Sequence, residues 1–268
     1  MDNKLPTIKK SIFLLLTGFA LGVFLAMTYS MILTLSDPGQ AIPNENLRIA
    51  LLVGELIIPL PIVIWVFKND LDIKQTFRFK AVKIKLLIPV FTAGLSLIII
   101  IDEIDRLLSV FFEKPENISQ IQELMKIDNL YSGLMIVGVI IFLGPFVEEI
   151  VFRGFFQQVL EEKLRNITSA VLISAFTFAV LHFNPWWVVQ IYILGFFMAF
   201  LAYRTGSILL PFFIHALNNG ISVVASQFEE IELTWYLWAG HVNPVILVLS
   251  VFFLLWGVRR FIRQSAGG

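Results

Sequence analysis

The stretch YSGLMIVGVIIFLGPFV, residues 131–147, contains no charged side chain, and it is one of eight apolar runs along the chain. A helix needs roughly 20 apolar residues to cross a bilayer, because each residue advances it by only about 1.5 Å. Hydrophobic residues fill 57% of the 268 positions, more than a water-soluble domain carries. The runs therefore predict an all-α fold, a polytopic membrane helix bundle with about eight transmembrane helices. They lie near residues 11–35, 49–67, 86–101, 131–149, 167–183, 186–203, 207–225 and 242–258.

The basic residues predict which helix ends share one side of the membrane. Most of the 20 Lys and Arg residues fall in segments that an eight-span topology puts on one side: 1–10, 68–85, 163–165, 204 and 259–263. The other side carries many acids: Asp102, Glu103, Asp105, Glu229, Glu230 and Glu232. Because basic loops stay in the cytoplasm, this pattern predicts a multi-pass protein of the cell membrane with both termini cytoplasmic.

The remaining composition limits domain organisation and chemistry. Eight spans leave little room for a soluble domain, so residues 1–268 are expected to form a single membrane domain. The chain has no cysteine, which excludes disulfides, thiolate metal sites and a cysteine nucleophile. The formal net charge is zero, so bulk charge gives no reason to expect nucleic acid as a partner. In the long outer segment 102–130, apolar residues at helical spacing predict a short amphipathic helix.

Three charged residues, Glu148, Glu149 and Arg153, follow directly on the uncharged stretch. Ionisable groups inside a span are costly, and they usually face a partner or a water-filled cavity. Glu149 and Arg153 are four residues apart and share a helix face, so we expect an ion pair between them. Glu148 points about 100° away around the helix and keeps no local partner, which suits a general base. The alternative is that all three form a packing network or simply lie at the inner interface.

Two more spans carry a histidine that has a motif partner four residues away on the same helix face. FAVLH (178–182) ends in His182, and HALNN (215–219) contains His215 and Asn219. Taken alone, His182 reads as an interfacial residue beside an aromatic belt, and the other two read as a polar contact between helices. Together with Glu148 they could converge on one cavity, activate water and stabilise an oxyanion. Counted from the inner helix ends, His215 lies about 13 Å deep, Glu148 about 18 Å and His182 about 24 Å, so convergence requires tilted helices.

The segments EEIVFR (148–153), FAVLH and HALNN match EExxxR, FxxxH and HxxxN in that order. In these motifs the chain resembles the CPBP family of intramembrane proteases, also called the CAAX protease and bacteriocin-processing, or Abi, family. The resemblance covers roughly residues 131–225 and implies a catalytic core there. It implies hydrolysis of peptide bonds by direct attack of water, with Glu148 and His182 activating the water. His215 and Asn219 would then stabilise the oxyanion, while Glu149 and Arg153 would hold the helix and tune the site.

Cofactor and partners follow from the same residues. Glu148, His182 and His215 could hold zinc together with a water, the usual catalytic arrangement, or they could act without a cofactor. The expected partners are membrane lipid and a peptide or membrane-protein substrate, with no nucleic acid. Two other classes stay open: a non-catalytic membrane scaffold or bacteriocin self-immunity protein, and a proton-coupled transporter with Glu55, Glu148 and His182 as its relay.

Overall fold

The computed structural model describes residues 5–37, 42–115, 117–228 and 233–266. Four charges that entered the topology prediction, Lys4, Glu229, Glu230 and Glu232, lie outside these residues. The first half of the chain forms α1 (Ile8–Ser36), α2 (Asn44–Ile57), α3 (Leu60–Lys68), α4 (Ile73–Thr76), η1 (Ile84–Leu86), α5 (Leu87–Phe111) and α6 (Asn117–Leu124). The second half forms α7 (Leu130–Met135), η2 (Ile136–Leu143), α8 (Gly144–Glu149), η3 (Ile150–Phe156), α9 (Gln157–Leu164), α10 (Ile167–Val180), η4 (Pro185–Trp187), α11 (Val188–Thr205), α12 (Leu209–Ala225), β1 (Leu237–Trp238), β2 (His241–Val242) and α13 (Pro244–Ala266).

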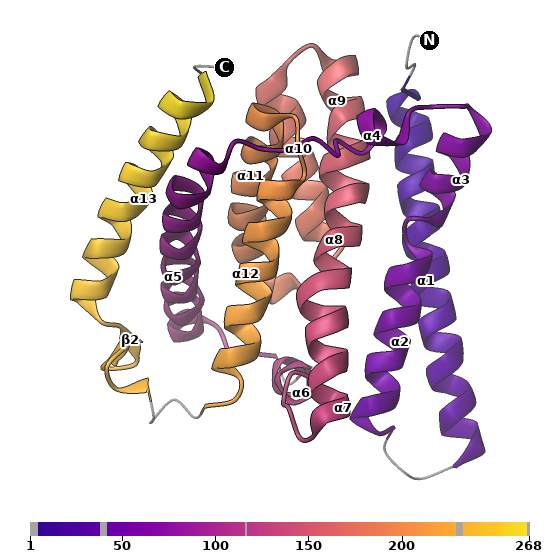
Figure 1. Cartoon of the computed structure of the whole chain (residues 1–268). Coiled ribbons are helices and arrows are strands. Elements are labelled where there is room, and N and C mark those ends of the chain that lie inside the picture. Colours follow the sequence, from indigo (N-terminus) through magenta and orange to yellow (C-terminus); the bar gives the residue numbers. More distant parts are fainter. Residues whose placement is uncertain (1–4, 38–41, 116, 229–232, 267–268) are drawn as a thin grey trace.

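The helices stand side by side as one bundle (Figure 1). Helices α1 and α2 form one edge, α5 and α13 form the other, and the long helix that contains α7 to α9 lies between them (Figure 1). The start of α1 and the end of α13 lie at the same end of the bundle. The only strands among the described residues are β1 and β2, an antiparallel pair of two residues each. The predicted all-α architecture is therefore confirmed.

Six helices in the described part of the chain are long and apolar enough to cross a membrane, against eight predicted spans. They are Ile8–Ser36, Asn44–Lys68, Ile84–Phe111, Leu130–Leu164, Pro185–Thr205 and Pro244–Ser265. The other two predicted spans become the shorter apolar helices α10, of 14 residues, and α12, of 17 residues. Both stand among the longer helices of the bundle (Figure 1), and each keeps exposed apolar side chains, such as Phe176 of α10 at 57% and Phe213 of α12 at 39%.

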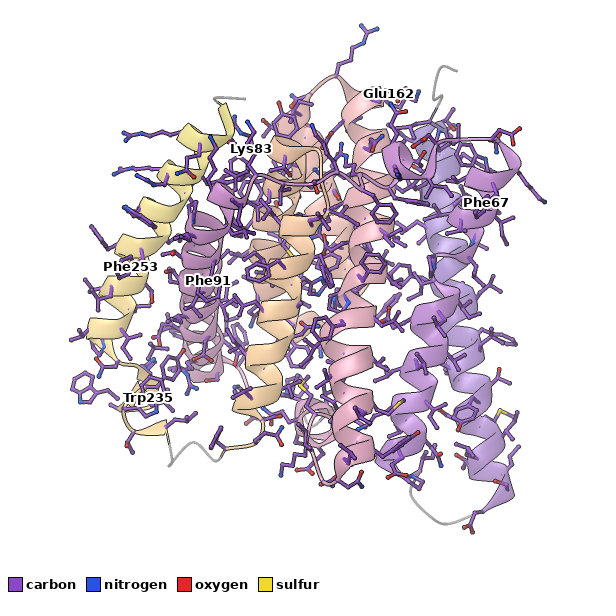
Figure 2. The ribbon with its side chains drawn as sticks, in the orientation of Figure 1. Phe67, Lys83, Phe91, Glu162, Trp235 and Phe253 are labelled. Carbon is purple, nitrogen blue, oxygen red and sulfur yellow. The ribbon has the colours of Figure 1, made fainter. Side chains whose placement is uncertain are left out.

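Large apolar side chains cover the outside of the bundle. Phe13 and Phe24 of α1 expose about 60% of their surface, and Phe67 and Phe253 point outward from the edges (Figure 2). Exposing such a surface to water would cost free energy. Hydrocarbon tails, in contrast, are as apolar as the side chains they contact. The buried core gathers around the long central helix, where Phe152 and its neighbours are almost fully enclosed.

Three helices continue well past their predicted ends, among them α13, which was expected to end at residue 258 and reaches Ala266. The third span was expected to end at residue 101, but α5 continues to Phe111, and the fourth was expected to end at 149, but its helix continues to Leu164. The charges that suggested those ends are accommodated on the helices. Glu103 accepts hydrogen bonds from Val242 N and from Nδ1 of His241, and Asp105 accepts one from Trp186 Nε1. The acids thus mark a polar cap on α5 rather than a loop.

Tyr236 belongs to this polar cap. Its hydroxyl donates to Asp102 at 2.9 Å. Burial, followed by the charge of Asp102, raises the pKa of Tyr236, so the hydroxyl keeps its proton and remains a donor. The residues around β1 are thereby attached to the end of α5.

The predicted amphipathic helix in the outer segment is confirmed as α6. It is held by Arg48 of α2, whose side chain is only 2% exposed. The guanidinium donates to the carbonyl of Leu124 at 3.0 Å and to that of Lys126 at 2.8 Å, and it lies 3.8 Å from Asp128. Leu124 is the last residue of α6 and Lys126 lies two residues beyond it, at the end where a helix leaves acceptors without partners.

Helix α1 packs closely against the second span through glycine. A Cβ atom on Gly18 would collide with the backbone carbonyl oxygen of Ile58, and one on Gly22 would lie 3.0 Å from the carbonyl oxygen of Gly54. Small residues allow two membrane helices to approach until their backbones touch. Gly138, on the central helix, is a natural comparison because a Cβ there would meet nothing within 4 Å.

We predict that Gly18→Ala destabilises the protein while Gly138→Ala does not. Overpacking at Gly18 should cost about 1–3 kcal/mol, because backbone rather than a flexible side chain stands in the way. For a chain of this size, the thermal midpoint in detergent should fall by about 2–12 °C. Equal midpoints for the two variants would show that α1 and the second span are not packed through Gly18.

Candidate active site

Residues 130–164 form one continuous helix whose hydrogen-bond pattern changes along its length. The segments η2 and η3 are π-helical, and the short α-helical segment α8 lies between them. Glu148 and Glu149 are the last two residues of α8. Such π-helical turns inside α-helices are rare and often occur at functional sites.

Pro145 explains why Asn219, a motif residue of α12, hydrogen-bonds to this helix. In the π-helical pattern the N–H of residue i bonds to the carbonyl five residues earlier, as Gly144 N does to Val139 O. The next carbonyl, that of Ile140, would need the N–H of residue 145, which proline lacks. Asn219 of α12 supplies the donor instead, with its Nδ2 2.9 Å from the Ile140 oxygen. One of the two Asn219 N–H groups is therefore already engaged in joining α12 to the central helix.

Glu149 and Arg153 form the expected ion pair. The Arg153 Nη1 to Glu149 Oε1 distance is 2.8 Å, and both side chains are 0% exposed. The same carboxylate oxygen lies 2.9 Å from Nδ1 of His215 on α12. Arg153 also donates through Nη2 to the carbonyl of Gly195 on α11, at 3.2 Å. One buried pair thus joins three helices.

Phe178, the first residue of FxxxH, packs at the centre of the motif residues. Its ring lies 4.1 Å from the guanidinium carbon of Arg153, a cation–π contact. The ring centroids of His182 and His215 lie 4.7 Å and 5.6 Å from it, both edge-on. Phe178 therefore fixes the spacing between the ion pair and the two imidazoles.

Glu148 faces both imidazoles. Its Oε2 lies 3.6 Å from His215 Nε2 and 4.0 Å from His182 Nε2. These distances are too long for direct hydrogen bonds and are typical of groups bridged by water. No described residue hydrogen-bonds to this buried oxygen. The side chains become more open from His215 (7% exposed) through Glu148 (17%) to His182 (30%).

The two imidazoles are held in different ways. His182 Nδ1 lies 2.8 Å from the carbonyl of Phe178, so this nitrogen carries the proton and Nε2 is an acceptor in the neutral ring. His215 Nδ1 instead faces the carboxylate of Glu149. A ring that donates through Nδ1 to this carboxylate has Nε2 as an acceptor when it is neutral and as a donor when both nitrogens carry a proton.

The site residues converge despite their unequal counted depths because α12 begins deeper than its neighbours. Its first turn is bonded to the segment before η1: Ser207 Oγ donates to Lys80 O at 2.5 Å, and Ile208 N donates to Arg78 O at 3.2 Å. Figure 1 shows this segment crossing the bundle well short of the turn between α9 and α10. Counting from one common plane therefore underestimated the depth of His215.

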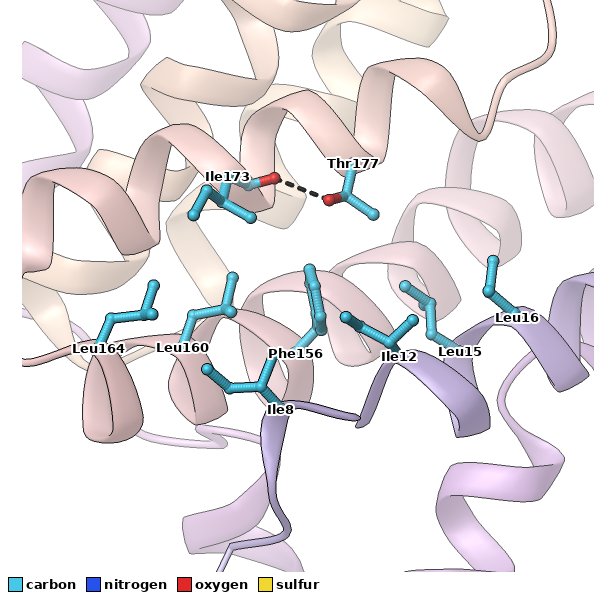
Figure 3. A pocket seen from close by; sticks show the side chains of 9 residues that line it. All are labelled: Ile8, Ile12, Leu15, Leu16, Phe156, Leu160, Leu164, Ile173 and Thr177. Atoms are coloured by element: carbon cyan, nitrogen blue, oxygen red, sulfur yellow. Dashed lines mark hydrogen bonds between the residues drawn. The ribbon is translucent and has the colours of Figure 1, made fainter. Parts of the chain in front are cut away.

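A cavity of about 190 Å³ adjoins Glu148. It lies between α2, α6, the central helix and α12, and its polar lining consists of Glu55, Glu148 and Asn219. A larger groove of about 350 Å³ lies elsewhere, between α1, α9 and α10 (Figure 3). Its lining is apolar apart from Thr177, whose hydroxyl bonds to its own helix at Ile173, so it offers no chemistry. The ionisable groups are concentrated around the smaller cavity.

All six motif residues were candidates from the sequence, but some of their contacts were not predicted. It assigned no role to Phe178 and did not anticipate that Glu149 would bind His215. It considered Glu55 only as part of a transporter relay, although its position on the face of α2 that carries Arg48, seven residues earlier, could have indicated an inward side chain. His241, which received no role, binds Glu103 of the polar cap.

The described residues also bear on the zinc alternative. Among them, no group of three or more His, Asp and Glu side chains is arranged to hold a metal ion, Glu148, His182 and His215 included. His215 Nδ1 and His182 Nδ1 already have partners within the fold.

Comparison with known proteins places the motifs in a family. The sequence model described as "Type II CAAX prenyl endopeptidase Rce1-like" matches residues 130–221, which include all six motif residues. The Bacillus subtilis (strain 168) protein named "Putative membrane peptidase YdiL" is 38% identical over 90 residues, covering 34% of this chain and 36% of that protein. The chain thus matches about a third of this relative's length. No solved structure matches the chain.

These matches agree with the motifs and confirm the resemblance and the membrane localisation predicted from the sequence. The matched residues 130–221 include Glu148, His182 and His215, which lie together in the structure. Residues 130–221 are a domain of the Rce1-like type II CAAX prenyl endopeptidase family, the CPBP family.

Proposed function

We propose that this chain is an intramembrane endopeptidase that hydrolyses peptide bonds of membrane-associated substrates with a water activated by Glu148 and His182. The observation that carries the proposal is one buried carboxylate oxygen, Glu148 Oε2, faced by two imidazole nitrogens at 3.6 Å and 4.0 Å. A water between these three atoms would have a base and an acceptor within reach. The proposed catalytic core runs over residues 131–225 of a single membrane domain, 1–268.

In the proposed reaction Glu148 takes a proton from the water, and the water oxygen bonds to the carbonyl carbon of the substrate. His182, with its proton on Nδ1, accepts the second O–H of the water at Nε2 and orients it. The carbonyl oxygen becomes an oxyanion. When the carbon–nitrogen bond breaks, Glu148 passes its proton to the leaving amine, which leaves a carboxylic acid and an amine as products.

His215 and Asn219 are the proposed oxyanion donors. This role requires His215 to carry a proton on both ring nitrogens, so that Nδ1–H is donated to Glu149 and Nε2–H to the oxyanion. Asn219 lines the same cavity and has one amide N–H beyond the one it donates to Ile140. Glu149 and Arg153 act as positioning residues, because their charges are paired with each other and neither is exposed.

We also propose that the basic end of the bundle faces the cytoplasm. The start of α1, α4, and the end of α13 lie at one end (Figure 1), and Figure 2 shows Lys83 there and Trp235 at the opposite end. The positive-inside rule supports a cytoplasmic position for the end with the basic loops. His182 follows the far end of α10, so the site would lie nearer the opposite side.

We predict that Glu148→Gln and His182→Ala each lower peptide cleavage by about 10²–10⁴-fold, because each removes a group that moves or orients a proton. Cleavage of a membrane-anchored peptide library by the purified chain in detergent measures this. Glu162→Gln is the matched control, since Glu162 is 45% exposed and pairs with the adjacent Lys163. Full activity in Glu148→Gln would contradict the proposal and favour a scaffold or immunity protein.

The same assay should show cleavage that survives a zinc chelator. Glu148 and His182 then need no metal to activate water. Cleavage that is lost with the chelator and restored by zinc would instead make the protein a metalloprotease. The chelated protein should be checked for an unchanged thermal midpoint, so that unfolding is not mistaken for loss of metal.

We predict that Glu149→Gln lowers stability much more than Glu148→Gln, because it leaves the buried Arg153 charge without its partner. Breaking such a pair typically costs about 3–5 kcal/mol. The double variant Glu149→Gln/Arg153→Met removes both charges and should recover most of the thermal midpoint while remaining inactive. If Glu149→Gln alone keeps both its midpoint and its activity, the positioning role is wrong.

A further inference from the structure

Glu55 shares a cavity with Glu148 although they lie on different helices. The residue lies on α2, and its carboxylate lines the 190 Å³ cavity together with Glu148 and Asn219. The walls around them are apolar and come from Leu51 of α2 and from Ile121, Leu124 and Met125 in and just after α6. None of the three family motifs includes Glu55.

One oxygen of the Glu55 carboxylate has no partner among the described residues. Its Oε2 is buried and hydrogen-bonds to no described residue, and the same holds for Glu148 Oε2. The two carboxylates also repel one another. The buried arginines among the described residues all have other partners: Arg48 binds carbonyls at the end of α6, Arg78 pairs with Glu161 and Arg153 pairs with Glu149. A buried carboxylate is costly unless a cation or a donor reaches it.

The Glu55 carboxylate lies beside Gly144, about one helical turn before Glu148. A Cβ on Gly144 would lie 3.6 Å from the carboxyl carbon of Glu55. Gly144 precedes Glu148 by four residues, about one helical turn or roughly 5.4 Å. An extended peptide advances by about 3.3 Å per residue, so a substrate bound at Glu148 would bring a side chain one or two residues away to Glu55.

The size and lining of the cavity limit what can bind there. Its volume of about 190 Å³ is below the 300–1,000 Å³ typical of pockets for small molecules, and it suits a single side chain. Lys and Arg have long aliphatic stems that pack on apolar walls while the charged group reaches a polar end. The cavity offers apolar walls from α6 and a carboxylate at Glu55.

We propose that Glu55 is a specificity residue that binds the cationic side chain of a Lys or Arg in the substrate, within two residues of the bond that is cleaved. The inference rests on the proposed peptidase function. It names the substrate class as peptides with a basic residue beside the scissile bond. The cation would also relieve the repulsion between the carboxylates of Glu55 and Glu148.

The test compares peptides that differ at one position beside the cleaved bond, Lys against Gln and Arg against citrulline. For the wild-type chain in detergent we expect kcat/KM to be at least about tenfold higher for the basic peptides, because a site built for a polar partner rejects analogues that lack it. Glu55→Gln should reduce this preference to less than about twofold and retain cleavage of the Gln peptide. Glu45→Gln is the matched control, since Glu45 is an exposed carboxylate in the first turn of the same helix.

Two outcomes would overturn the inference and leave the peptidase function intact. One is equal cleavage of Lys and Gln peptides by the wild type. The other is an equal loss of cleavage of every peptide in Glu55→Gln, which would mean that Glu55 moves a proton in the reaction instead of selecting the substrate.

A binding measurement separates this inference from the proposed function. The Glu148→Gln chain should bind the Lys peptide more tightly than the Gln peptide, and the further change Glu55→Gln should abolish the difference. Failure of the wild type to cleave any peptide, combined with this binding preference, would reject the function and keep the cationic site. Equal binding of both peptides would reject the site.

Discussion

The buried ion pair between Glu149 and Arg153 is the interaction on which the arrangement of the site depends. Both side chains are fully enclosed, so neither charge can be solvated by water, and each is stabilised only by the other and by neighbouring dipoles. The pair is bonded to His215 on α12 and to Gly195 on α11, and its cation lies over Phe178 on α10. Moving any of these helices would leave a charge uncompensated in a low-dielectric interior, which fixes their positions relative to the central helix.

The irregular hydrogen bonding of the central helix contributes a second constraint. Pro145 removes one backbone donor, and the carbonyl of Ile140 is satisfied by Asn219 from a neighbouring helix. A regular α-helix would satisfy this carbonyl within itself and would give Asn219 no reason to lie there. The same feature that weakens the helix locally thus joins α12 to it beside Glu148.

These two constraints separate stability from chemistry along one short sequence. Glu149 is fully paired and enclosed, whereas the adjacent Glu148 has an unpartnered oxygen at a cavity. The helical rotation between consecutive residues directs one carboxylate into the protein and the other into the cavity. The neighbouring carboxylate of Glu55, contributed by a part of the chain outside the matched family domain, enlarges the polar surface that a substrate would meet.

Sequence alone determined the features that depend on local periodicity and on transfer from water to hydrocarbon. The apolar runs predicted the positions of the helices, and the four-residue spacing of Glu149 and Arg153 predicted their ion pair, because neighbours on one helix face are fixed by the helix itself. The ends of α5 and of the central helix were predicted too early, since charged residues that end an apolar run can also cap a helix that continues. The tertiary structure alone decided that His215 contacts Glu149, that Asn219 reaches Ile140 and that Glu55 joins the cavity of Glu148. Contacts between helices depend on how far each helix is shifted and rotated against its neighbours, and here the deep start of α12 beneath the segment at Lys80 set that shift.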